Sequence, residues 1–170
     1  MIMQCLKCKR EIFDSSTFCP ICGAKQTPIY KELFVRKGLT EEEFIDNINK
    51  WFQWHPNVAN VKVTFDKDTS IGLLVNKYKL EMVTLEYELL NGNNKYEYGI
   101  VKEEKFALMQ TSVKEYVEKW KSERPGVKVV NWTGGVHSRG QTGSLMLKGI
   151  GARNRMTAYI VYKFPRNSTL

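Results

Sequence analysis

The four cysteines of the chain stand in two Cys-x-x-Cys pairs, Cys5 with Cys8 and Cys19 with Cys22, and ten residues separate the pairs. Two residues between paired cysteines bring both sulfurs into one tight turn. Two such turns that face each other supply a tetrahedron of sulfur, which is the ligand geometry that Zn²⁺ prefers. A site closed by four thiolates leaves no open position for catalysis. The spacing therefore predicts a structural zinc ion.

The residues within and after each pair carry a resemblance to a known family. The second pair reads Cys19-Pro20-Ile21-Cys22-Gly23, with a glycine that tolerates positive φ, whereas the first pair is followed by Lys9. Over roughly residues 3 to 26 the chain resembles the bacterial zinc-ribbon family. The resemblance implies bound Zn²⁺ with Cys5, Cys8, Cys19 and Cys22 as its ligands. It implies no single function, because ribbons occur both in nucleic-acid machinery and as protein-docking modules.

Two other interpretations of the cysteines stay open. Iron in a rubredoxin-like site uses similar pairs, although rubredoxin pairs are much further apart in sequence. A disulfide or a redox pair is the other alternative. Met1 to Gln4 lead into the first cysteine without a basic region and an apolar run, so we expect a cytoplasmic protein with reduced thiols. No apolar run approaches the roughly 20 residues that cross a bilayer, so we expect no membrane insertion.

Positive charge is concentrated at the carboxyl end. The formal net charge is +8, and Glu123 is the last acidic residue. A segment without carboxylates projects a positive field that attracts polyanions or an acidic protein surface. The cations after Glu123 are Lys128, Arg139, Lys148, Arg153, Arg155, Lys163 and Arg166. The alternative is that they pair in space with Glu97, Glu103, Glu104 or the carboxylates of the helices.

Two glycine-rich stretches, 133–144 and 148–155, lie within this basic segment. Glycines expose backbone N–H groups and permit the turns that build anion-binding nests, and arginine adds a fork that binds phosphate. We therefore expect loops that contact a polyanion, and the alternative is an enlarged connection between strands. The residues assigned to this polyanion site are Arg139, Lys148, Arg153 and Arg155, together with Lys7, Lys9 and Arg10 of the ribbon.

The elements that position these residues can be read from capping boxes and alternation. Thr40 with Glu43, and Ser112 with Glu115, predict the starts of two helices, and His55 is expected to cap the end of the first. Strands are predicted over 31–36, 58–65, 71–79, 82–90, 95–101, a stretch reaching about 108, 127–131, and a closing strand to 164. We expect a zinc ribbon over 1–27 and an α+β domain over 28–170 with a mostly antiparallel sheet.

The α+β domain shows signs of an internal repeat. Lys50-Trp51 recurs as Lys119-Trp120, and Pro56-x-Val58 recurs as Pro125-x-Val127, both displaced by 69 residues. The pattern predicts two βαβββ halves, 30–92 and 95–165, related by a pseudo-twofold axis.

These patterns favour a non-enzymatic zinc protein that binds nucleic acid or another polyanion. The alternative is an adaptor that docks onto an acidic protein through the ribbon and a sheet edge. An enzyme would have to use His137 beside Ser138, but neither paired carboxylates nor a nucleophile motif accompanies them. No catalytic residue is therefore assigned.

Overall fold

The computed structural model describes residues 2–5, 7–13, 16, 18–26, 28–68, 79–107, 112–138 and 154–166. The elements run in the order β1 (Ile2–Gln4), β2 (Glu11–Phe13), β3 (Tyr30–Val35), α1 (Glu41–Trp54), β4 (Val58–Asp68), β5 (Lys79–Leu89), β6 (Tyr96–Ala107), α2 (Val113–Ser122), β7 (Lys128–Ser138) and β8 (Asn154–Pro165). The strand predicted for 71–79 falls outside the described residues except for Lys79. Within the described part of the chain, neither helix is both long and apolar enough to cross a bilayer.

Both helices begin at the predicted capping boxes. The Thr40 hydroxyl accepts from the Glu43 backbone N–H at 3.2 Å, and the Glu43 carboxylate accepts from the Thr40 N–H at 2.8 Å. Donation by Thr40 lowers the pKa of Glu43. Ser112 and Glu115 repeat the arrangement at the start of α2. The reciprocal bonds satisfy N–H groups that a helix start leaves without partners. At the end of α1, His55 is the cap residue as predicted.

Two three-stranded antiparallel sheets form the body, in the orders β3-β5-β4 and β6-β8-β7. In each half, the last strand in sequence lies in the centre. In the first half, the central residue Leu85 pairs with Glu32 on one side and Val63 on the other. In the second half, Ile160 pairs in the same way with Val101 and Trp132. The two residues that flank the central one are 31 positions apart in both halves (63 minus 32, 132 minus 101). The predicted α+β class with antiparallel pairing is confirmed. The strands form two sheets, however, and the described part of each half is βαββ.

Each helix covers one face of its own sheet through equivalent contacts. Trp51 of α1 packs edge-on against Tyr87 of β5 with ring centroids 5.1 Å apart. The ring centroids of Trp120 in α2 and Tyr162 in β8 are 5.6 Å apart. A register irregularity between Ala59 and Lys62 in β4 recurs between Val129 and Asn131 in β7. The topology, the register and the helix contacts therefore repeat along the chain.

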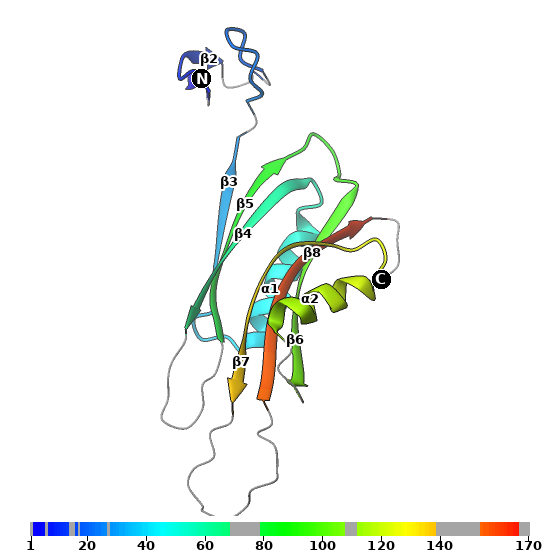
Figure 1. Ribbon diagram of the computed structural model, residues 1–170. Helices are drawn as coiled ribbons and strands as arrows, with labels where there is room; N and C mark the ends of the chain where they lie inside the picture. The colour runs from blue at the N-terminus through cyan, green and yellow to red at the C-terminus, as the bar shows by residue number, and fades with distance from the viewer. Residues whose placement is uncertain are drawn as a thin grey trace, which may run out of the picture.

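The two halves do not pack through equivalent faces, as a twofold axis would require. The main core contains Phe44, Ile48 and Phe52 of α1, the inner face of the first sheet, and Tyr159 and Val161 of the second sheet. Ala158 and Ile160, on the opposite face of the second sheet, pack against α2. Figure 1 shows the same order, with α1 between the sheets and α2 beyond the second sheet.

The sequence explains this head-to-tail packing, in which the two halves meet through different faces. The shared register makes Thr84 and Glu86 of the first sheet the counterparts of Tyr159 and Val161. Thr84 and Glu86 are partly exposed, whereas Tyr159 and Val161 are fully buried. A polar face cannot be buried without partners at low cost, so within the described part of the chain the second sheet alone is covered on both sides. The two halves therefore repeat the same topology. They are not related by the predicted pseudo-twofold axis, because the second half stacks on the helix-covered face of the first.

Polar contacts of α1 set how the second sheet lies against it. The Asn49 amide donates to the Ile100 carbonyl at 3.0 Å and accepts from the Ile100 N–H at 2.8 Å. Since β6 is an edge strand, Asn49 supplies the partners that a further strand would supply. Glu41 bonds with Lys102 and with the Tyr159 hydroxyl. Burial acts to lower the pKa of Lys102, but Glu104 and Glu41 together raise it.

Replacing Asn49 with alanine removes both bonds and leaves the N–H and C=O of the buried residue Ile100 without partners. We expect Asn49→Ala to lower the free energy of unfolding by about 1–3 kcal/mol, measured by urea denaturation. The control is Asn47→Ala on the exposed side of the same helix, which should change it by less than about 0.5 kcal/mol. Equal effects of the two substitutions would show that Asn49 does not support the β6 edge.

Candidate functional site

The four cysteine sulfurs converge at the N-terminal end of the molecule. All four Sγ atoms lie within 4.8 Å of one another, with 3.6 Å between Cys5 and Cys22 and 3.7 Å between Cys8 and Cys19. A disulfide would need sulfurs about 2.05 Å apart. Four thiolates at about 2.3 Å from a central zinc ion would be about 3.8 Å apart. The cluster therefore fits a tetrahedral metal ion.

Two similar turns, which we call the knuckles (residues 5–10 and 19–24), hold the sulfurs. In the first, Cys5 N–H donates to the Arg10 carbonyl at 2.8 Å, and in the second, Cys19 N–H donates to the Ala24 carbonyl at 2.7 Å. The residue after each pair has positive φ, 61° at Lys9 and 67° at Gly23. Lys9 thus adopts, with a side chain, the conformation that glycine provides in the second knuckle. β1 and β2 pair beside the first knuckle.

Electrostatics inside the cluster favour a cation. Burial acts to raise the pKa of Cys5, but N–H donors of Cys8 and Lys7 outweigh it and lower the pKa to about 6. At Cys22 the Ala24 N–H acts to lower the pKa, yet burial and the other cysteines raise it to about 11. At these distances a negative charge on one sulfur repels a negative charge on the next. A divalent metal removes that conflict and makes all four thiolates ligands.

The metal module, defined here as residues 2–26, has a very small apolar core among the residues whose burial the structure describes. Within its described part, the buried cluster consists of Cys5, Ile12 and Cys19, with Cys8 and Cys22 packed against it. Phe13 and Phe18 are 71% and 60% exposed, and Ile21 is 51% exposed. Sequence patterns did not single out these side chains as site residues. The available signal is their position between or beside the cysteines in a segment too short to bury them.

The predicted polyanion residues are only partly placed by the structure. Lys7, Lys9 and Arg10 are exposed on the first knuckle. Arg139, Lys148 and Arg153 lie outside the described residues. The backbone of Arg155 pairs within β8, opposite Phe106 and His137. Whether the two glycine-rich stretches form one site therefore stays a prediction.

The first glycine-rich stretch is not a loop over its whole length. Residues 133–138 belong to β7 and pair with β8. A Cβ on Gly134 would lie 2.7 Å from Val113 Cγ1 at the start of α2 and 2.5 Å from the Thr157 carbonyl oxygen. Glycine is therefore needed there for close packing of helix, neighbouring strand and sheet, and not for an anion-binding nest at that position. The ring of Tyr162 similarly covers Gly99.

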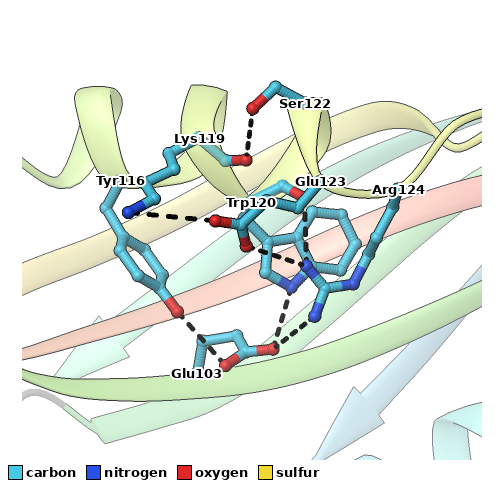
Figure 2. Close-up of polar contacts among 7 residues, drawn as sticks. All are labelled: Glu103, Tyr116, Lys119, Trp120, Ser122, Glu123 and Arg124. Atoms are coloured by element: carbon cyan, nitrogen blue, oxygen red, sulfur yellow. Dashed lines mark hydrogen bonds and ion pairs between the residues drawn. The ribbon is translucent and has the colours of Figure 1, made fainter.

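A second polar cluster, shown in Figure 2, joins α2 to β6. Glu103 accepts from Trp120 Nε1 at 2.8 Å and from the Tyr116 hydroxyl at 3.2 Å. Arg124 lies 3.9 Å from the same carboxylate and stacks over the Trp120 ring at 4.4 Å. Burial, followed by Glu103, raises the pKa of Tyr116 to about 12. These bonds hold α2 on the second sheet, so we assign the cluster a structural role.

Among the basic residues whose side chains the structure describes, the pairing alternative holds for Arg166. Arg166 lies 3.3 Å from Glu97 and donates to the carbonyl oxygens of Asn94 and Pro56. Lys128 and Lys163 instead lie over the Tyr96 ring. The basic segment is therefore not neutralised residue by residue in its described part.

The positive φ of Lys9 predicts a stabilising substitution. A residue with a side chain loses about 1 kcal/mol of folding free energy when it adopts positive φ, and glycine does not. Because the module folds around its metal, this loss lowers the metal affinity. We expect Lys9→Gly to retain metal severalfold better in competition with a chelator. Lys9→Ala removes the same charge but keeps the side-chain cost, so it should show no gain. Equal behaviour of the two variants would contradict the account.

No protein-family model, no curated protein and no solved structure matches the chain. Its function therefore has to be inferred from the geometry of its own residues. That geometry identifies a four-cysteine site suited to a metal ion, joined to an α+β body.

Proposed function

We propose that the protein is a non-enzymatic, zinc-stabilised binding protein that contacts nucleic acid through its metal module. The observation that carries the proposal is the combination, in one small module, of a closed four-sulfur site with exposed aromatic and basic side chains. Four thiolates leave no coordination position for a substrate, so the metal stabilises the module and does not catalyse.

Zinc is the proposed metal because it accepts four thiolates in a tetrahedron without redox chemistry. Iron also accepts this ligand set, but the ten-residue separation of the pairs is short for a rubredoxin-like site. The metal compensates for the missing apolar core, because binding free energy becomes folding free energy in modules of this size.

Nucleic acid is the proposed ligand because two kinds of contact are available side by side in the sequence. Lys7, Lys9 and Arg10 are exposed cations that can neutralise backbone phosphates. Phe13 and Phe18 are exposed π faces on which unpaired bases can stack. This combination favours single-stranded nucleic acid over a duplex, whose bases are already stacked.

The adaptor is the second candidate function, and Ile21 favours it. This apolar side chain is 51% exposed in the same module, and it has no π face for a base. With Phe13 and Phe18 it would offer an apolar docking surface with a basic rim, suited to an acidic protein.

Metal removal tests the structural role. We expect the purified protein to contain one zinc ion per chain, and a strong chelator to collapse the amide signals of the module in a ¹⁵N–¹H NMR spectrum while the body signals stay in place. Cys22→Ser should have the same effect, and Ser16→Ala in the same module should not. A module that keeps its dispersed signals without metal would refute the structural role.

Oligonucleotide binding tests the ligand. Fluorescence anisotropy with a labelled single strand should show Phe18→Ala binding about 5- to 100-fold more weakly, the range for one lost stacking contact. Ile21→Ala is the matched control and should bind normally. Replacing Lys7, Lys9 and Arg10 with glutamine should reduce the salt dependence of binding. The nucleic-acid proposal fails if no binding occurs even at low salt. The adaptor function is favoured instead if Phe18 and Ile21 are both needed to capture a protein.

A further inference from the structure

Three lysine side chains, which we call the lysine cluster (Lys95, Lys128 and Lys163), gather around one tyrosine at an end of the second sheet. Their Nζ atoms lie 5.4, 5.7 and 5.1 Å from the centroid of the Tyr96 ring. Lys163 also lies 5.9 Å from the ring of Tyr98, its partner across the β6–β8 ladder. The cluster joins three separate stretches of the chain, so local sequence does not reveal it.

The charge of the lysine cluster is not balanced by neighbouring carboxylates. Among the described residues, no ion pair involves any of its three members. Glu97, next to Tyr96 in the chain, pairs with Arg166 instead. Lys128 and Lys163 are direct partners across the β7–β8 ladder, and like charges in that position destabilise a sheet. An anion among the three ammonium groups would relieve this repulsion.

A hollow between the C-terminal end of α1 and the start of β6 is lined by Tyr96 and Tyr98, the two rings that the lysines contact. His55, Glu97 and Arg166 also line it, and the carboxylate of Glu97 is paired with Arg166. The bonds of Arg166 to backbone carbonyls and to Glu97 fix its guanidinium as part of the wall. His55 Nδ1 donates to the Trp51 carbonyl at 2.7 Å, and this bond fixes the orientation of the ring. Aromatic and polar groups therefore lie next to the unbalanced positive charge.

We propose that the lysine cluster and this hollow form a binding site for the phosphate group of a nucleotide. The ammonium groups hold the phosphate through charge-assisted hydrogen bonds, and the partly exposed ring of Tyr96 offers a contact to the base, whereas Tyr98 is already stacked on Phe52. None of these residues belongs to the metal module, so the site goes beyond the function proposed above and does not depend on it. A free nucleotide and a nucleic-acid strand present the same phosphate chemistry.

The direct experiment is calorimetric titration of the zinc-loaded full chain with adenosine monophosphate, with adenosine as the comparison. We expect saturable binding of the monophosphate and at least about tenfold weaker binding of adenosine. Lys128→Gln combined with Lys163→Gln should weaken monophosphate binding at least about tenfold. Lys114→Gln, at an exposed lysine of α2, is the control and should bind like the unmodified protein.

Folding and ligand source can be separated in the same experiment. Removing two like charges should raise the thermal midpoint of the double variant without ligand, so its loss of binding would not reflect misfolding. Phe18→Ala should bind the monophosphate normally, which distinguishes this site from the metal module. If a single-stranded oligonucleotide displaces the monophosphate, the phosphate that the site binds belongs to a nucleic-acid strand. If the oligonucleotide does not displace it, the phosphate belongs to a free nucleotide. Absence of saturable binding, or unchanged affinity in the double lysine variant, would overturn the proposal.

Discussion

Mutual repulsion among four sulfur ligands is the constraint on which the N-terminal module depends. Their Sγ atoms lie within 4.8 Å of one another, so four negative charges there would repel one another and a bound cation offsets that repulsion. The same atoms occupy the place of an apolar core, because Ile12 is the one other buried hydrophobic residue among those residues of the module whose burial the structure describes. A module organised by metal need not bury its larger side chains. Phe13, Phe18 and Ile21 thus remain exposed and available to a partner.

The body is stabilised differently, by apolar burial directed through a few polar contacts. α1 contributes to a core shared by both sheets, and α2 closes the outer face of the second. Asn49 on the β6 edge and Glu103 beneath α2 determine where these helices lie. The second sheet packs against α1 on one face and against α2 on the other. Its end therefore offers a fixed platform on which Lys128, Lys163 and Tyr96 can be held together.

Local signals predicted more of this molecule than non-local ones. The metal ligands and both capping boxes were predictable because each depends on residues a few positions apart, and the positions of most of the described strands followed from alternation. The separation into two sheets was not predictable, because it depends on which sheet face meets α1. Gly134 was assigned to a loop because its close approach to Val113 is visible only in three dimensions. The convergence of Lys95, Lys128 and Lys163 likewise requires the strand pairing.

The identity and the ligands of the metal can be measured directly. X-ray absorption at the zinc edge, measured on the purified full chain, reports both. We predict four sulfur neighbours at about 2.3 Å, with neither nitrogen nor oxygen in the first shell. An absorption edge from iron alone, a first shell containing nitrogen or oxygen, or cysteines found as disulfides would contradict the claim that four thiolates hold a structural zinc ion.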